Sequence, residues 1–341
     1  MSSGTTATAA TSPAAAALST SSSASWNAIV AGAEKGGQLN IEGIDNDTVN
    51  QGMVAAFNKL YPQIKVSYQF LIGADLESRL QAEFANKLPG ADVGDFVDLN
   101  WLNAQTKVPG FFTTPVGPNV TSSAAVAANL VLPGGKVIAT LFAPQGYGYN
   151  TTVAGENMPF SEFVNPKFTG KVGLDDFCTN SAAAESYYLF PKLYGSNILQ
   201  ELPALKPSFY PDPNAGGQAM ESGEIAEFLP FFPASIPSGA ANIGTGYEQQ
   251  IIGATYYTAI LGNAHDPDAA QVWLNFLLSP QRLAARAQFS YNSVLPGNIP
   301  GATLASSRFN TLSTKANLSP SALTSWIEAA FPDLQPPVLL T

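Results

Sequence analysis

Carboxylates and aromatic rings are the side chains of this chain whose types and positions could carry chemistry. They gather in loops at the ends of the strands that the sequence predicts, and none of the 15 Lys and Arg residues falls in those loops. Carboxylates beside rings suit an organic cation, which gains ion pairing and cation–π contact. Neutral polar solutes such as sugars also fit, whereas an anion would have to rely on helix N-termini and hydroxyls. The candidate binding residues are Asp45, Asn46, Asp47, Asn100, Trp101, Tyr147, Asp175, Asp176, Asn180, Ser181, Phe231, Tyr247 and Tyr256.

Several of the acidic residues in these loops have a competing structural role. Asp47 and Asp75 stand at the start of predicted helices, where capping is the more frequent role of an Asp. Asp175 and Asp176 fit a solvated turn as well as they fit a ligand contact. The loops that supply most of the candidates span residues 45–48, 71–75, 99–101, 175–181, 230–237 and 244–256.

Catalytic chemistry would depend on few side chains, because the chain has one His and one Cys. His265 directly precedes Asp266, the predicted cap of a helix, which favours a surface turn residue. A lone Cys178 excludes an internal disulfide and a Cys-rich zinc site. The sequence also lacks a Walker-type loop and a dinucleotide fingerprint. We therefore predict no enzyme, cofactor or metal. Two alternatives are a secreted hydrolase that uses cleft carboxylates such as Asp47 and Asp175, and an adhesive surface protein.

The composition limits the partners of the chain. Its 341 residues include 15 Lys and Arg against 25 Asp and Glu, a net charge of −10. This acidic balance argues against nucleic acid and anionic membranes, which both need clustered Lys and Arg. Charged residues make up 12% of the chain, and its 29 Gly and 26 Pro favour a loop-rich secreted protein. The length suits one large or two medium domains, and the apolar runs are shorter than the roughly 20 residues of a spanning helix.

The N-terminal segment has a composition of its own. Residues 1–33 carry no charged side chain, and residues 1–25 are nearly all Ala, Ser and Thr. Such a segment buries too little apolar surface to offset the entropy of ordering, so we predict a disordered tether over residues 1–25. It lacks the basic region of a signal peptide. Our interpretation is a mature export form in which Met1 replaces the signal, with or without a lipid-bearing Cys; the alternative is an ordinary flexible N-terminus.

Strands and helices alternate from Trp26 onward, with short links between them. Residues 49–60 place apolar side chains at every third or fourth position, which predicts a helix with one buried face. The clearest helix has Asp266 as its cap and Pro267 at its first position. Alternation of this kind predicts an α/β fold with parallel sheets covered on both faces. The predicted strands span residues 38–44, 64–71, 91–99, 146–150, 170–177, 224–229 and 254–261.

The order of several motifs resembles that of type II extracellular solute-binding proteins of ABC importers, within the ferric-iron and spermidine/putrescine-like branches. The resemblance covers roughly residues 26–300. It implies a two-lobed periplasmic-binding-protein type II fold, in which each lobe is a mostly parallel sheet flanked by helices and a cleft lies between the lobes. The motifs are FNKLYPQIKVSYQF, ADVGDFVD, GYGYNTTV, FVNPKFTGKVGL, ESGEIAEFL and NAHDPDAAQVWLNFLLSPQ.

By this resemblance, crossing segments at residues 145–150 and 255–260 divide the chain. Lobe one would hold residues 26–144 plus 257–341, and lobe two residues 145–256. The implied function is the capture of a small solute in the cleft by a monomeric, secreted, periplasmic or cell-surface protein, which then delivers it to a membrane permease. Trp101 and Tyr247 are expected to form aromatic walls from opposite lobes, with Asp45 and Asp175 as polar contacts.

Ferric iron is a separate alternative for the ligand. The iron branch typically places two adjacent Tyr residues after a Gly-Glu-Ile strand, because phenolates are hard ligands for Fe(III). After Gly223-Glu224-Ile225 this chain has Phe231 and Phe232 instead. Tyr256 and Tyr257 are adjacent but fall in a predicted strand, where neighbouring side chains point to opposite faces. The sequence therefore disfavours iron bound in the usual way.

Overall fold

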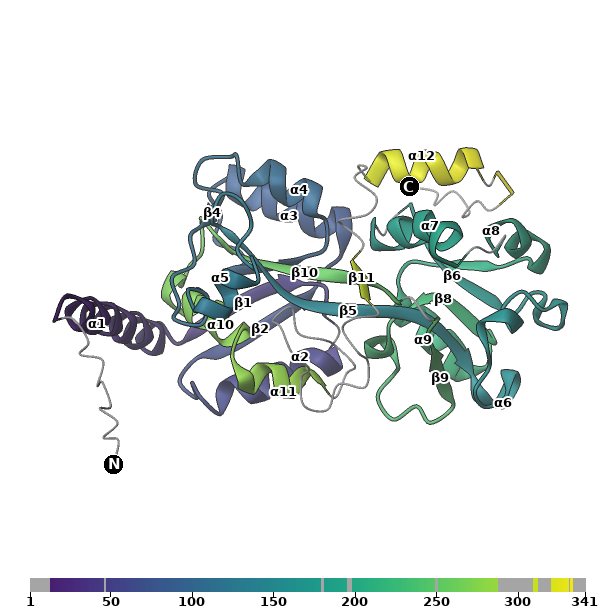
Figure 1. The fold of residues 1–341 in the computed structure, drawn as a ribbon, viewed down its shortest axis with the longest axis horizontal. Helices are drawn as coiled ribbons and strands as arrows, with labels where there is room; N and C mark the ends of the chain where they lie inside the picture. Colours follow the sequence, from purple (N-terminus) through teal and green to yellow (C-terminus); the bar gives the residue numbers. More distant parts are fainter. Residues whose placement is uncertain are drawn as a thin grey trace, which may run out of the picture.

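A computed structural model describes residues 13–45, 47–178, 181–194, 198–248, 251–287, 309–311, 320–330 and 332–333. Two α/β lobes lie side by side, and two long strands join them (Figure 1). Strand β5 (Val137–Asn150) runs from lobe one into lobe two, and β10 (Ile251–Leu261) returns. The two strands pair antiparallel, with a register shift between Tyr256 and Tyr257. The predicted α/β fold with helices flanking the sheets is confirmed.

Lobe one contains the parallel strands β1 (Gln38–Gly43), β2 (Lys65–Phe70) and β3 (Val93–Phe96), in the order β2-β1-β3. Strand β10 extends this sheet antiparallel to β3, and the short β4 (Phe112–Thr113) pairs with β10. Each parallel strand is followed by a helix, which is the connection that a parallel pair requires. The helices of lobe one are α2 (Asp47–Asn58), α3 (Gly73–Ala85), α4 (Leu99–Gln105), α5 (Ser123–Ala127), α10 (Pro267–Leu277) and α11 (Pro280–Ala287).

Lobe two repeats this plan. Strands β6 (Val172–Asp175), β7 (Ser208–Tyr210) and β8 (Glu227–Phe231) are parallel in the order β8-β6-β7. The crossing strand β5 enters antiparallel to β8, and β9 (Ile243–Gly246) pairs with β5. The helices are α6 (Thr151–Ala154), α7 (Ser181–Tyr194), α8 (Ile198–Glu201) and α9 (Pro213–Ser222), with short 3-10 turns at Phe160–Glu162, Pro166–Phe168, Leu202–Leu205 and Pro233–Ser235.

The apolar periodicity of the sequence identifies the helix faces that form the core of lobe one. Phe57 of α2 packs edge-on against Trp273 of α10, with ring centroids 5.0 Å apart, and against Phe276 at 5.2 Å. All three rings are buried. Asp266 accepts a hydrogen bond from the Ala269 N–H at 2.9 Å, which confirms the predicted cap of α10.

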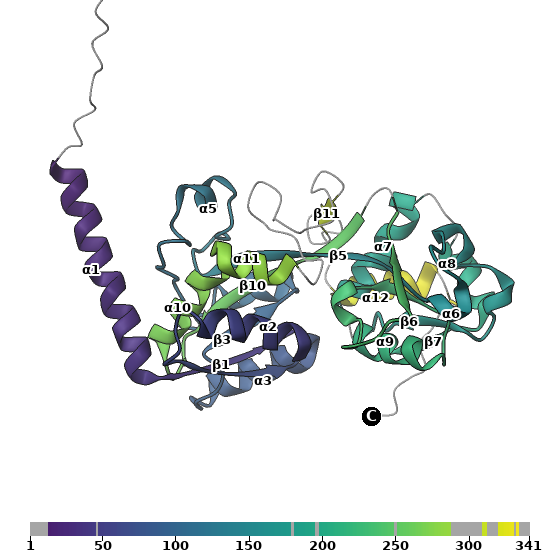
Figure 2. The same ribbon diagram turned by 90° about the horizontal axis from the view of Figure 1, so that it is seen from below.

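The N-terminal tether is the first correction. Helix α1 spans Pro13–Gly36, so the prediction of disorder up to Ser25 is wrong for residues 13–25, and residues 1–12 lie outside the described part. Ala is the strongest helix former, and it occupies positions 14–17 at the start of this helix. The C-terminal half of α1 is anchored by Trp26 and Ile29, which pack on the core beside α10. Figure 2 shows α1 along the outer side of lobe one.

The C-terminal region is the second correction. Strand β11 (Phe309–Thr311) pairs with β10, and helix α12 (Pro320–Ala330) packs on α7 of lobe two (Figure 1). The Trp326 ring meets the Tyr188 ring edge-on, with centroids 4.8 Å apart. The prediction that placed everything after residue 257 in lobe one is therefore wrong for α12, because the chain crosses between the lobes a third time to bury the apolar face of this helix.

The prediction that Asp75 caps a helix is also corrected by the structure. Helix α3 begins at Gly73 with Ile72 in the cap position, so Asp75 lies in the first helical turn and is not the cap. A carboxylate in the first turn still interacts favourably with the positive end of the helix. The residue that the sequence analysis treated as a cap thus supports the helix electrostatically.

Glu227 stands out in the core of lobe two because it is a carboxyl group with 0% exposure. Neither of its carboxylate oxygens has a hydrogen-bond partner among the described residues. Burial raises the pKa of Glu227 to about 9; nearby Lys167 opposes this rise and Glu162 adds to it. The group therefore keeps its proton at neutral pH in the folded protein.

We expect Glu227→Gln to remove part of the pH dependence of stability. The folded protein holds this proton up to about pH 9, while an unfolded Glu releases it near 4.5, so the wild type loses stability as pH rises through this window. Between about pH 5 and about pH 8, the variant should gain on the order of 4 kcal/mol relative to wild type. Urea unfolding measures this change, with exposed Glu221→Gln as the control. Equal slopes for wild type and Glu227→Gln would contradict the assignment.

Candidate functional site

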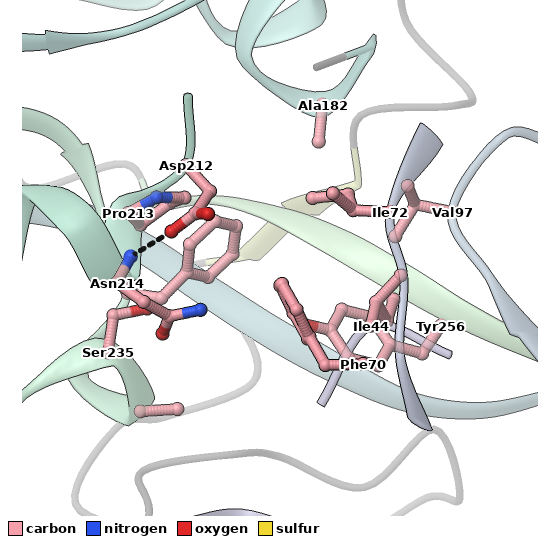
Figure 3. Close-up of a pocket in the computed structure, with 12 residues that line it drawn as sticks. Ile44, Phe70, Ile72, Val97, Ala182, Asp212, Pro213, Asn214, Ser235 and Tyr256 are labelled. Atoms are coloured by element: carbon pink, nitrogen blue, oxygen red, sulfur yellow. Dashed lines mark hydrogen bonds between the residues drawn. The ribbon is translucent and has the colours of Figure 1, made fainter. Parts of the chain in front are cut away.

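A pocket lies between the two lobes and contains about 500 Å³ of space that no atom fills. Its lobe-one wall comes from residues at or just after the carboxyl ends of β1, β2 and β3. Its lobe-two wall comes from the first residues of α7 and α9 and from the segment after β8. Figure 3 shows these two walls facing each other across open space. The lining residues are Ile44, Phe70, Ile72, Val97, Ala182, Asp212, Pro213, Asn214, Phe232, Ala234, Ser235 and Tyr256.

The position of the pocket follows from the strand order. In a parallel sheet the carboxyl ends of the strands open on one side, where the connections to the next helices begin. Ile44 follows β1, Phe70 ends β2 and Val97 follows β3, so three separate segments reach the same wall. Lobe two presents the corresponding side of its own sheet. Two such sides facing each other form a cleft at the position where α/β proteins bind small molecules.

Asp212 and Pro213 build the polar corner of the lobe-two wall. The Asp212 Oδ1 accepts hydrogen bonds from the N–H groups of Asn214 at 2.7 Å and Ala215 at 2.9 Å, and thereby caps α9. Pro213 occupies the first helical position, where its missing N–H costs nothing. The cap fixes the carboxylate beside Asn214 at the edge of the pocket (Figure 3). The second oxygen, Oδ2, takes part in neither bond.

The two walls differ in polarity. On the lobe-one side, Ile44, Phe70, Ile72 and Val97 are hydrocarbon or aromatic and Tyr256 of β10 adds a single hydroxyl, whereas lobe two adds the polar side chains of Asp212, Asn214 and Ser235. No Lys, Arg or His is among the described residues that line the pocket.

Three carboxyl groups from both lobes come together near this pocket. Asp98 caps α4, its Oδ1 accepting the Trp101 N–H at 2.9 Å. Burial raises the pKa of Glu77, on α3, to about 8, and the charge of Asp98 adds to this rise. Burial likewise raises the pKa of Glu185, on α7 of lobe two, to about 7, again with a contribution from Asp98. Glu77 is therefore mostly protonated at neutral pH and Glu185 about half protonated. Asp98 directly follows lining residue Val97, and Glu185 lies one turn after lining residue Ala182.

Among the predicted site residues that the structure describes, only Tyr256 lines the pocket. Asp45 is buried directly after lining residue Ile44, and its N–H donates to the Tyr68 hydroxyl at 3.1 Å. Asp175 is fully buried at the end of β6, where its carbonyl accepts a hydrogen bond from the Tyr187 hydroxyl at 3.0 Å.

Asp176 takes the turn role that the sequence analysis kept as an alternative. Its Oδ1 accepts a hydrogen bond from the Cys178 N–H at 2.7 Å. Burial raises the pKa of the Cys178 thiol to about 11, and Asp176 and Glu328 add to this rise. The thiol is therefore protonated at neutral pH, which is the opposite of what a nucleophilic cysteine requires.

The other predicted residues lie away from the pocket lining. Tyr147 is buried in lobe two, where its hydroxyl donates to the Met158 carbonyl at 2.8 Å and its ring packs on Phe160. Phe231 is buried in a second, smaller core. Tyr247 is largely covered, and burial raises the pKa of its hydroxyl well above the ordinary value. Asn100 is exposed on α4. Asp47 is the first residue of α2, and Ser181 is the first residue of α7. Asn46 and Asn180 lie outside the described residues.

Trp101 belongs to an aromatic cluster of lobe one. Its ring stacks on Phe96 at 5.3 Å between centroids and meets Phe111 at 5.8 Å and Phe112 at 6.3 Å. The expected aromatic wall from this residue is therefore not supported. Phe70 and Phe232 are instead the rings that lobe one and lobe two bring to the pocket.

Asp212 and Asn214 are not among the predicted binding residues, although the sequence carries a signal for them. Asp212-Pro213 repeats the Asp266-Pro267 pattern that identified the start of α10. The same rule would have located the start of α9, and with it a helix end that faces the cleft. Ile72, Phe232 and Ser235 do fall in the predicted loops.

We expect Trp101→Ala to cost about 2–4 kcal/mol of folding free energy, because it removes a ring packed against three others. Urea unfolding without any added solute measures the loss. Asn103→Ala, at an exposed position on the same helix, should change stability by less than about 0.5 kcal/mol. A loss below about 1 kcal/mol for Trp101→Ala would show that the ring does not belong to the core.

Comparison with known proteins supports the class that this geometry defines, a two-lobed protein with a binding pocket between its lobes. The sequence matches the family described as "Bacterial extracellular solute-binding protein" over residues 19–282. Among curated proteins, none matches. The chain therefore belongs to the family of bacterial extracellular solute-binding proteins.

Solved structures show the same fold at low sequence identity. The substrate binding protein of an ABC transporter from Agrobacterium tumefaciens has a TM-score of 0.72 and 15% identity, over 87% of this chain and 94% of that one. Iron-bound HitA from Pseudomonas aeruginosa has a TM-score of 0.60 and 19% identity, over 87% and 98%. AfuA from Actinobacillus pleuropneumoniae, with fructose-6-phosphate bound, has a TM-score of 0.60 and 16% identity, over 87% and 98%. The fold is thus that of type II periplasmic binding proteins.

The family defines the general role of the chain as extracellular solute binding. Within the described ranges, no helix is both long and apolar enough to span a membrane. The ligands named for the neighbours differ, one being iron and another a sugar phosphate. The fold therefore leaves the solute to be inferred from the pocket itself.

Proposed function

We propose that this protein captures a small organic solute, cationic or neutral, in the pocket between its lobes, and that the closed form is what the permease recognises. The observation that carries the proposal is that both lobes line one pocket of about 500 Å³. A solute that contacts both walls is bound more tightly when the lobes are closed, so binding energy drives closure. We further propose that the protein acts as a monomer at the cell surface or in the periplasm, with or without a lipid anchor.

The charge around the pocket supports a cationic or neutral solute over an anion. The described lining contains one carboxylate, that of Asp212, and no positively charged side chain. Nearby Asp98 and Glu185 add negative charge from both lobes. A multivalent anion would meet this charge without an Arg or Lys to offset it.

The two alternatives, a hydrolase and an iron carrier, find less support in the lining. Glycoside hydrolysis uses two carboxyl groups across a cleft, and Asp212, the one lining carboxylate, has Oδ1 committed to the cap of α9. Among the described residues, no group of three or more His, Cys, Asp or Glu side chains is placed to hold a metal ion. The pocket thus favours binding of an organic solute.

Thermal shift with a panel of sugars, amines, amino acids and phosphate esters tests the proposal. A solute that binds raises the melting temperature by about 2–5 °C at concentrations near 100 times its Kd, because it stabilises the folded state. Asn214 is half-buried at the start of α9 and lines the pocket, so Asn214→Trp should fill the pocket and abolish the shift. Gln218 is exposed on the same helix, so Gln218→Trp should retain the shift. A solute consumed during the assay would support the hydrolase, and no shift with any solute would contradict the proposal.

A further inference from the structure

The lobe-one wall of the pocket limits the surface that a solute can present to it. On this side Ile44, Ile72 and Val97 contribute hydrocarbon and Phe70 contributes a ring, while Tyr256 of β10, which lies beside them, contributes a hydroxyl; the other four side chains form a surface with no hydrogen-bonding group (Figure 3). A polar group pressed against it would lose water without gaining a partner. A sugar carries hydroxyls around its whole edge and would bury several of them in this way. The wall therefore favours a solute with at least one apolar face.

Aromatic rings from both lobes determine which shape the apolar face of the solute can have. Phe232 and Tyr256 are 8% and 7% exposed, so the protein already holds them in place without a solute. Phe70 and Tyr256 lie on the lobe-one side of the pocket (Figure 3), and Phe232, which follows β8, belongs to lobe two. Rings that are fixed before binding lose little conformational entropy when a flat group stacks against them. The pocket is therefore preorganised for a planar ring.

The remaining wall determines where charge can sit. Asp212 Oδ1 accepts both capping bonds of α9, and Oδ2 takes part in neither. Asn214 and Ser235 lie on the same side as this carboxylate (Figure 3). Asp98 directly follows lining residue Val97, and its charge raises the pKa of Glu185, on α7 of lobe two, so this carboxylate acts across the gap between the lobes. An ammonium group near Asp212 would offset this charge and gain a charge-assisted hydrogen bond.

We propose that the pocket selects an organic cation with a planar, ring-bearing apolar body, an inference that rests on the proposed function. The ring lies between Phe70 and Tyr256 on the lobe-one side and Phe232 on the lobe-two side, and the cationic group meets Asp212. The inference deepens the proposed function by naming the solute class, and it predicts discrimination by ring and by charge separately.

Three indole compounds of nearly equal size test the charge preference. Tryptamine is a cation at neutral pH, tryptophol is neutral and indole-3-acetate is an anion. By calorimetry, tryptamine should bind roughly tenfold or more tightly than tryptophol, the scale of one charge-assisted hydrogen bond, and indole-3-acetate should bind most weakly. Putrescine, which has two charges and no ring, should also bind roughly tenfold or more weakly than tryptamine.

A matched pair of variants assigns this preference to Asp212. Asp212→Asn keeps a side chain that caps helices well and removes the charge. It should reduce the preference for tryptamine over tryptophol to within about threefold. Asp266 is also an Asp followed by Pro that caps a helix, but it lies in lobe one, away from the pocket. Asp266→Asn should leave the preference at its wild-type value. Asp212→Ser, a second capping substitution, replaces Asp212→Asn if that variant does not fold.

The outcomes separate this inference from the proposed function. If a sugar or phosphate ester shifts the melting temperature, Asn214→Trp blocks it, and no indole compound or other ring-bearing amine binds, the inference is overturned while the proposed function stands. If Asp212→Asn leaves the preference unchanged, the assignment of the cation to Asp212 is wrong. If no solute of any class binds, the proposed function itself fails.

Discussion

The antiparallel pairing of β5 with β10 is the constraint on which the rest of this structure depends. Both strands belong to the sheet of lobe one, and β5 continues into the sheet of lobe two, where it pairs with β8 and β9. A polar network crosses this pair in lobe one. The buried Arg282 donates to the Thr140 carbonyl at 2.8 Å, and the Thr140 hydroxyl lies 3.3 Å from that of Thr258, which in turn donates to Asp95. Buried polar groups in such a network must all stay paired, so it holds the crossing strands in one register.

The pocket is a consequence of this connection. Because both lobes grow from the same pair of strands, the carboxyl ends of β1, β2 and β3 face the first residues of α7 and α9 across a short gap. Hinge motion about β5 and β10 can widen the gap without breaking either sheet. Helix α12 adds a further connection, since its Trp326 packs on Tyr188 of lobe two while β11 pairs with β10. Opening of the lobes must therefore accommodate this third crossing of the chain.

Charge and polarity are distributed unevenly between the two walls. Lobe one supplies hydrocarbon and lobe two supplies the Asp212 corner, so a bound solute has a defined orientation. The carboxyl groups of Glu77, Asp98 and Glu185 bring like charges from both lobes near each other, and their shared influence on pKa reflects that proximity. Burial and the charge of Asp98 together favour the protonated forms of Glu77 and Glu185 near neutral pH.

The sequence by itself determined the local elements and their order. The apolar period of α2 and the Asp266-Pro267 cap of α10 are read from residues close together in the chain, where sterics and hydrogen bonding act locally. The alternation of strands and helices, together with the order of the motifs, predicted the α/β fold and the two lobes. Two of the predicted loops also contain Ile72, Phe232 and Ser235 of the pocket.

Tertiary structure decided which side chains from those elements meet. Trp101 stands after a strand like a cleft residue, but Phe111 and Phe112, which lie on a later loop and strand, surround its ring. Asp212 is a helix cap in any local description, and it becomes part of a binding pocket because β5 and β10 bring lobe one opposite it. Long-range packing chooses among the contacts that local sequence permits, since the burial of a ring or a carboxylate depends on segments that are far away in the chain.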